Sequence, residues 1–180
     1  MSLWVFGYGS LMWNPEFDYL QKRRARVQGF MRGFSMASVH HRGTAEAPGL
    51  VLALDPQLGA QCEGIVFEVA AHNEAVVIQA LRERELISSA YLEATLRAQF
   101  DDGGSVQVLA FIMDQSHTQY CGHLTLEEQA QIIARSVGGR GPNWDYLYNT
   151  AAQLRELGVD DADMNWLEAR VREIRHERLA

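Results

Sequence analysis

Cysteine is scarce in this chain. Cys62 and Cys121 are the only two cysteines among 180 residues, and they lie far apart with no C-x-x-C spacing. They provide neither the framework of a small disulfide-rich protein nor the ligands of a structural zinc site. We expect both to be buried small side chains. The adjacent His40 and His41 give little indication of a metal, because neighbours on a strand point to opposite faces. We assign the chain no metal and no cofactor.

An excess of basic residues is also missing. The chain has 16 Lys and Arg against 23 Asp and Glu, a net charge of −7. It therefore lacks the positive charge with which proteins bind nucleic acids and anionic membranes, and we expect neither partner. One short cationic run, at residues 22–26, is expected on a solvated strand edge.

Long hydrophobic runs and flexible linkers are missing as well. No apolar run has the length of a membrane span, and the first residues lack the basic start of a signal peptide, so we expect a cytoplasmic protein. There is no Ser- or Gly-rich linker. With 47% hydrophobic residues, residues 1–180 fit a single domain with a substantial core.

Strand-like segments dominate the first two thirds of the chain. Turn residues Asp55, Pro56 and Gly59 predict a break between two of them, and a polar/apolar alternation before Asp101 predicts a hairpin. The expected strands cover residues 3–5, 27–34, 49–54, 64–69, 91–100 and 106–113.

Helical patterns dominate the last third, with one helix earlier, at residues 73–85, for which Asn73 is the expected N-cap. Thr125 and Glu128 predict a capping box, and Gly138-Gly139 the end of that helix. Further helices are expected from 142 to the stop at 158, and after 160–161. Strands first and helices last predict an α+β fold whose sheet can close into a barrel.

A glycine loop follows the first expected strand, in residues 6–11 (FGYGSL). Glycine lets the backbone approach a ligand closely, and successive N–H groups can form a nest for a carboxylate, phosphate or oxyanion. The dinucleotide fingerprint is excluded because Met12 stands where a third Gly is needed. The hydrolase elbow is excluded because Tyr8 and Met12 stand at its Gly positions, so Ser10 is a poor nucleophile candidate. The alternative is a tight turn that closes the core.

Among the carboxylates, Glu85 stands out by its surroundings. It lies where the helical pattern changes to the apolar and small residues 86–90. A carboxylate among apolar neighbours is a candidate proton acceptor with a raised pKa. The alternative is that residues 82–85 (RERE) form an exposed charged face. Glu83 and Glu85, two apart on a helix, cannot both face one pocket.

Several short segments follow one another in a characteristic order. They are residues 4–11 (WVFGYGSL) with Trp13, 41–44 (HRGT), 47–52 (APGLVL), 62–64 (CEG), Arg84-Glu85, Tyr91-Leu92, Gln119-Tyr120, and Asn143 with Tyr146 and Asn149. In this order and spacing the chain resembles, nearly end to end, the ChaC-like family of glutathione-specific γ-glutamylcyclotransferases.

The resemblance implies a small mixed β-barrel flanked by helices, and a small-molecule substrate. In that family the Tyr-Gly-Ser-Leu loop holds the γ-glutamyl end of the substrate, and the Glu of the Arg-Glu pair, here Glu85, transfers protons. The α-amine attacks the side-chain amide carbonyl, which gives 5-oxoproline and expels Cys-Gly. The substrate-binding residues expected in this chain are Tyr8, Gly9, Ser10, Leu11, Arg42, Tyr91, Tyr120 and Tyr146.

Three positions depart from the family's pattern. Gly33 replaces a usual second Arg, Ser89-Ala90 stand where Gly is common, and Glu93 replaces a frequent Pro. These departures keep two alternatives open. One is a cyclotransferase for other γ-glutamyl amines or amino acids, and the other is a non-catalytic γ-glutamyl-peptide binder, which would retain the loop and lose the base.

Overall fold

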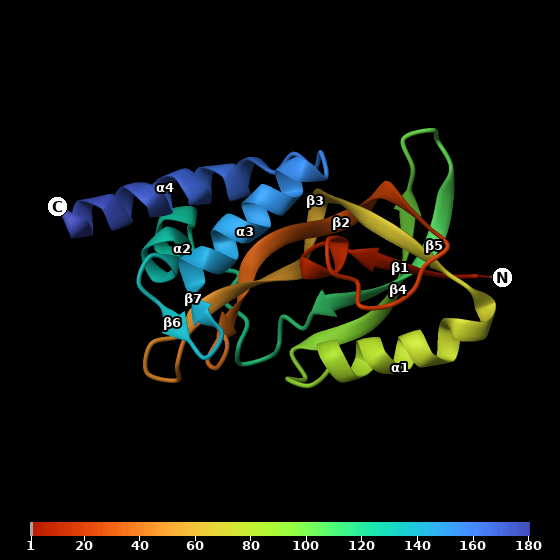
Figure 1. Cartoon of the computed structure of the whole chain (residues 1–180), viewed down its shortest axis with the longest axis horizontal. Coiled ribbons are helices and arrows are strands. Elements are labelled where there is room, and N and C mark those ends of the chain that lie inside the picture. Colours follow the sequence, from red (N-terminus) through yellow and green to blue (C-terminus); the bar gives the residue numbers. More distant parts are fainter. Residues whose placement is uncertain (1) are drawn as a thin grey trace. The chain divides into compact units, whose positions relative to one another are not determined.

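The computed structural model describes residues 2–180, in which five strands form a closed barrel in the order β1-β3-β2-β4-β5 (Figure 1). β5 pairs in parallel with β1, placing Val5 opposite Leu109, whereas β1 with β3 and β4 with β5 are antiparallel. The expected α+β fold with a small mixed barrel is confirmed. The strands are β1 (Leu3–Gly7), β2 (Gln21–Ser38), β3 (Gly49–Val69), β4 (Tyr91–Gln99), β5 (Ser105–Met113), β6 (Val137–Gly138) and β7 (Gly141–Pro142).

Helical segments accompany the strands along the chain. The α-helices are α1 (Glu74–Glu85), α2 (Leu126–Ile133), α3 (Asn143–Glu156) and α4 (Ala162–Leu179), and the short 3₁₀ turns are η1 (Ser10–Met12) and η2 (Ala71–Asn73).

The chain forms two compact units. Unit 1 comprises Met1–Gly33 and Ala53–Thr118, and unit 2 comprises Phe34–Leu52 and Gln119–Ala180. β2 and β3 contribute residues to both units, and α1 belongs to unit 1 while α2, α3 and α4 belong to unit 2. The single domain expected over residues 1–180 stays a prediction.

The core of unit 1 joins α1 to the barrel. Val77 and Leu81, one helical turn apart, place their side chains in the same cluster as Val5 of β1 and Phe111 of β5. Leu11, from the loop after β1, is part of this cluster too. Burial of α1's inner face therefore fixes the helix against the strand from which the glycine loop emerges.

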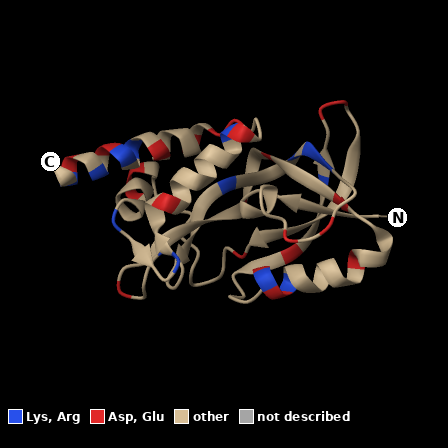
Figure 2. Cartoon of the chain, in the orientation of Figure 1, with Lys and Arg blue, Asp and Glu red and all other residues tan. Residues whose placement is uncertain are grey.

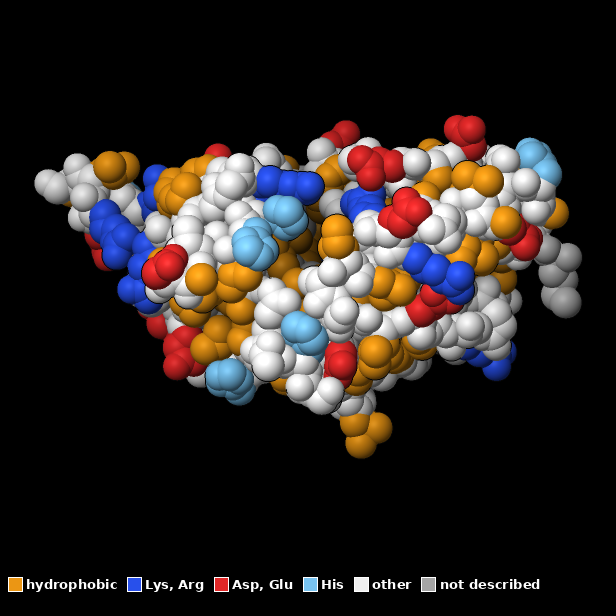
Figure 3. Space-filling model, turned by 90° about the horizontal axis from the view of Figure 1, so that it is seen from below, with side chains coloured by type: hydrophobic (Ala, Val, Ile, Leu, Met, Phe, Trp, Pro, Cys, Tyr) orange, Lys and Arg blue, Asp and Glu red, His pale blue; other side chains and the backbone are white. Residues whose placement is uncertain are grey.

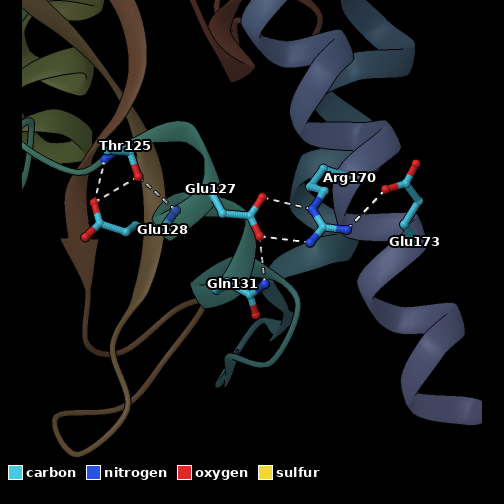
Figure 4. A network of polar contacts seen from close by, with 6 residues as sticks. All are labelled: Thr125, Glu127, Glu128, Gln131, Arg170 and Glu173. Carbon is cyan, nitrogen blue, oxygen red and sulfur yellow. Dashed lines mark hydrogen bonds and ion pairs between the residues drawn. The ribbon is translucent and has the colours of Figure 1, made fainter.

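Unit 2 is built around three helices that pack on one another (Figure 1). α3 buries Leu147, Ala151 and Leu154 at helical spacing, and α4 buries Leu167 and Val171. A polar network reinforces the contact of α2 with α4 (Figure 4). Arg170 donates two hydrogen bonds of 2.9 Å to the carboxylate of Glu127.

Helix starts and the hairpin follow the sequence patterns closely. The capping box of Thr125 and Glu128 is present, and the Asp161 side chain accepts a hydrogen bond from Met164 N at 3.0 Å. β4 and β5 form the expected antiparallel hairpin. Asn73 occupies the N-cap position of α1, but its side chain makes no capping hydrogen bond.

Two expected boundaries were wrong. Segments 49–54 and 64–69 are parts of one strand, β3, which continues through Asp55 and Pro56. Gly59 has φ +81° there, a conformation that lets a strand bulge without ending. α2 ends at Ile133 rather than at Gly138, because residues 137–138 leave the helix to pair with β7.

Charged side chains are distributed over the surface of each unit. Acidic and basic side chains follow one another along α4 and meet at the end of α1 (Figure 2). In the cationic run 22–26 at the start of β2, the partly exposed Arg23 and Arg26 form ion pairs with Asp102 and Asp101. On the face drawn in Figure 3, charges of both signs are interspersed with hydrophobic side chains. Within residues 2–180, no helix combines the length and the apolar character needed to cross a bilayer.

Candidate active site

The glycine loop folds back on the end of β1. Gly7 pairs with Ile65 of β3, and the chain then turns so that Met12 N donates to Gly9 O at 2.9 Å. A Cβ on Gly7 would lie 3.0 Å from the Cβ of Leu11, so a larger residue would require this neighbour to shift by a few tenths of an ångström. Tyr8 and Leu11 are buried, and Ser10 is half-buried.

Arg32 of β2 holds the backbone of this loop. Its Nε donates to Tyr8 O at 2.7 Å, and its Nη2 donates to Glu63 O. Only 6% of Arg32 is exposed. A buried guanidinium that bonds two carbonyls fixes the loop against β3. Sequence reasoning missed Arg32 as a site residue, although it lies in the Gly-aromatic-x-Arg pattern at residues 29–32.

Arg84 holds the loop from the other side. Its Nη2 donates to Ser10 Oγ at 2.7 Å. Its Nη1 donates to Asn14 O at 3.2 Å and to Glu16 Oε2 at 2.8 Å. Since Arg84 lies in the last turn of α1, one side chain connects the end of this helix to the loop that follows β1.

Glu85, the last residue of α1, lies next to this connection. Its Oε1 is 3.3 Å from Arg84 Nε, and 17% of its side chain is exposed. Burial raises the pKa of the Glu85 carboxyl, and the positive charge of Arg84 opposes that rise. Glu83, in contrast, is exposed and accepts a hydrogen bond from Gln79 at 2.7 Å. The two carboxylates thus differ in burial, and the role of Glu85 in proton transfer stays a prediction.

Tyr91 opens β4 and packs against the core of unit 1. Two residues on, Glu93 accepts hydrogen bonds of 2.6 and 2.9 Å from Arg82. The departure from Pro at position 93 thus creates an ion pair between β4 and α1. Ser89, which stands where Gly is common in the family, has φ +58°, a conformation that favours glycine.

The other expected binding residues belong to unit 2. Arg42 donates from Nη1 to Arg140 O at 3.0 Å and to Pro142 O at 3.2 Å, and its guanidinium carbon lies 5.3 Å from the centre of the Tyr146 ring. Tyr146 OH accepts a hydrogen bond from Leu52 N at 3.3 Å. Tyr120 forms a β-bridge with Met36. The structure thus brings Arg42 and Tyr146 together within unit 2.

The expected site residues therefore form two groups. Unit 1 links the loop at residues 8–11 to Glu85 through Arg84, and it also holds Tyr91. Unit 2 holds Arg42, Tyr120 and Tyr146. A single substrate site that includes both groups stays a prediction.

A cavity of about 490 Å³ lies within unit 2. Ala37, Pro48, Leu50 and Ile132 contribute to its mainly apolar wall, and none of the expected site residues lines it. Cys121 also faces this cavity and is half-buried, so the expectation that both cysteines are buried was correct for Cys62 alone. Within residues 2–180, no three His, Cys, Asp or Glu side chains are grouped so as to hold a metal ion.

Comparisons with known proteins agree on one family. A family model described as "ChaC-like protein" matches residues 3–174. A glutathione-specific γ-glutamylcyclotransferase of Escherichia coli K12 is 33% identical over 172 residues, which cover 96% of this chain and 74% of the relative. Glutathione-specific γ-glutamylcyclotransferase 1 of Danio rerio is 34% identical over 174 residues, covering 93% of this chain and 88% of the relative.

A solved structure shows the same fold. The crystal structure of a selenomethionine-labelled γ-glutamylcyclotransferase specific to glutathione from yeast superposes with a TM-score of 0.87 at 22% identity, and the match covers 98% of both chains.

Proposed function

Since the chain belongs to the ChaC-like family, we propose that it is a glutathione-specific γ-glutamylcyclotransferase. The relatives from Escherichia coli and Danio rerio, whose names state this activity, match more than nine tenths of the chain. The structural observation that carries the proposal is the largely buried Glu85 carboxylate, connected through Arg84 to Ser10 of the glycine loop. The carboxylate proposed to transfer protons and the loop proposed to hold an anion are therefore joined through one arginine, by an ion pair and a hydrogen bond.

The reaction is an intramolecular aminolysis. The α-amine nitrogen of the γ-glutamyl group attacks its own γ-carbonyl carbon, the new C–N bond closes a five-membered lactam, and the C–N bond to the cysteine nitrogen breaks. The products are 5-oxoproline and Cys-Gly. Holding the substrate folded for attack can contribute about 7–11 kcal/mol to lowering the barrier. The polypeptide needs to supply no nucleophile of its own.

Glu85 is proposed to move the protons. The α-amine is mostly an ammonium at neutral pH and must lose a proton before it attacks, and the departing nitrogen must gain one. Burial of Glu85 raises the pKa of its carboxyl above its ordinary value, against the opposing charge of Arg84. A base whose pKa is nearer the working pH is also a better acid in the second step, so one group can serve both steps.

The loop at Tyr8, Gly9, Ser10 and Leu11 is proposed to bind the γ-glutamyl end. Arg32 and Arg84 support this proposal, because they fix Tyr8 O and Ser10 Oγ. A loop fixed before substrate arrives presents its N–H groups without further loss of entropy. We also propose that Arg42, Tyr91, Tyr120 and Tyr146 bind substrate, and that residues 1–180 act as a single catalytic domain.

A cytoplasmic location is proposed as well. Cytosolic glutathione keeps protein thiols reduced, and Cys62 and Cys121 are both thiols rather than partners in a disulfide. The proposed partner is the small-molecule substrate. Nucleic acid and membrane surfaces are not proposed partners, in keeping with the net charge of −7.

The experiment that tests the proposal is a substrate panel. Purified protein is incubated with reduced glutathione, with γ-glutamyl amino acids and with other γ-glutamyl amines, and the products are identified by mass. Formation of 5-oxoproline and Cys-Gly from glutathione alone is the expected result. Turnover of the whole panel would instead favour the broader cyclotransferase, which the departures at Gly33 and Ser89 motivate. Release of free glutamate would show hydrolysis and contradict the mechanism.

A further inference from the structure

Two arginines in the last turn of α1 differ sharply in their contacts. The guanidinium of Arg82 is bonded to Glu93, and 49% of its side chain is exposed. The side chain of Arg84 is 26% exposed and contacts Ser10, Asn14 and Glu16 of the loop as well as Glu85. Arg82 therefore joins α1 to β4, whereas Arg84 joins the loop to the carboxylate proposed as the base.

The contacts of Arg84 use separate nitrogens. Nη2 bonds Ser10 Oγ, Nη1 bonds Asn14 O and Glu16 Oε2, and Nε faces Glu85 Oε1. The rigid guanidinium fork sets the directions of these contacts relative to one another. Lysine has one compact charge and cannot span the same four partners. The position of Glu85 relative to Ser10 is thus tied to the shape of this one side chain.

From these contacts we propose that Arg84 is a positioning residue, which sets the place of the Glu85 carboxylate relative to the glycine loop. The proposal rests on the function proposed above. The ion pair is formed by Oε1 of Glu85, and the proposal assigns the substrate's proton to Oε2.

The surrounding charges support this role. Arg84 is the charged group that acts on Glu85, and its field lowers the carboxyl pKa against the effect of burial. From the loop, Glu16 pairs with Nη1 of Arg84 at 2.8 Å. From β4, Glu93 is held by Arg82. Without Arg84, the Glu85 carboxyl would experience burial with no compensating cation, and its pKa would rise.

The experiment compares Arg84→Gln, Arg84→Lys and the matched control Arg82→Gln in the full chain. In Arg84→Gln we expect kcat at pH 7 to fall by about 10- to 100-fold, the typical effect of displacing a reacting group by about 1 Å. The acidic limb of the kcat–pH profile should move to higher pH, because Glu85 then stays protonated over a wider range. Arg84→Lys should restore the pH profile but not the full kcat, and Arg82→Gln should resemble the wild type.

A second measurement does not depend on turnover. The pKa of the Glu85 carboxyl, followed by carbon NMR in the protein without substrate, should rise in Arg84→Gln and stay near the wild-type value in Arg82→Gln. If the wild type produces no 5-oxoproline, the proposed function fails. The titration of Glu85 still tests whether Arg84 acts on its carboxyl. An unchanged Glu85 pKa, or a wild-type kcat–pH profile in folded Arg84→Gln, overturns the positioning role. Should Arg84→Gln not fold, Arg84→Lys decides, because full wild-type kcat in that variant contradicts the need for the fork.

Discussion

Asn143 binds both backbone groups of Leu50. Its Oδ1 accepts from Leu50 N at 2.7 Å, and its Nδ2 donates to Leu50 O at 2.8 Å. Asn143 is completely buried at the start of α3, and Leu50 lies near the start of β3. The amide therefore ties α3 to β3 within unit 2.

Replacing Asn143 by Ala should destabilise the protein markedly. The N–H and C=O of Leu50 would lose their partners while buried, and each unsatisfied group costs about 1–3 kcal/mol. We expect a loss of about 2–4 kcal/mol in the free energy of unfolding, measured by urea denaturation. Asn149→Ala, at an exposed position of the same helix, is the control and should change little. Equal stability of the two variants would show that Leu50 finds other partners.

Glu85→Gln should remove turnover and keep the fold. Glutamine preserves the shape of the side chain but cannot accept the ammonium proton, and loss of general acid–base assistance typically costs about 10²–10⁴-fold in rate. Substrate affinity, measured by calorimetry with glutathione, should change much less. Glu83→Gln, which alters the exposed neighbour of Gln79, should retain wild-type activity. Normal turnover in Glu85→Gln, or inactivity confined to Glu83→Gln, would refute the assignment.

Local sequence patterns predicted those parts of the fold that local forces determine. The alternation from Tyr91 onward gave the β4–β5 hairpin, and Thr125 with Glu128 gave the start of α2. The break expected at Asp55-Pro56 was wrong for a long-range reason. Gln115 donates to Asp55 Oδ1 at 2.8 Å and to Pro56 O at 2.9 Å, so residues that usually mark a turn are satisfied inside a strand.

Gly138, which lies beyond the end of α2, is a second residue whose role a local sequence pattern did not predict. A Cβ there would lie 2.5 Å from Gly43 N and 2.6 Å from Arg42 N. The glycine is therefore needed for close packing against a distant segment, and the helix has already ended at Ile133. A sequence pattern marks such a glycine but cannot tell a close approach from a helix stop.

In the candidate site, too, some features could be predicted from the sequence and others could not. The apolar neighbours of Glu85 made it a candidate and the family resemblance selected it, and the structure does place it in a largely buried position. The partners of Arg32 and Arg84 could not be predicted, because Arg32 bonds carbonyls 24 and 31 residues away, and Arg84 bonds Ser10 across 74 residues. Contacts over such separations depend on barrel closure and on the packing of α1, neither of which is visible in a local pattern.

Glu85→Gln should also make the protein more stable at neutral pH. Burial raises the pKa of the Glu85 carboxyl in the folded state above its ordinary value, so the folded protein binds this proton more tightly than the unfolded chain does. The stability that this proton contributes is complete below the ordinary glutamate pKa of about 4.3 and is lost as the pH rises through the folded-state value. Glutamine is neutral at every pH and incurs no such loss.

Thermal unfolding followed by circular dichroism between pH 4 and pH 8 checks this expectation. The melting temperature of Glu85→Gln should exceed that of the wild type at pH 8, and the difference should shrink toward zero near pH 4. Glu83→Gln should show no comparable trend, because Glu83 is exposed. A wild type more stable than Glu85→Gln at pH 8 would mean that attraction between Glu85 and Arg84 outweighs the cost of burying the charge. Greater stability of Glu85→Gln would instead show that the ionised carboxylate of Glu85 lowers the stability of the folded protein. Such a cost is expected for a group whose role is to transfer protons.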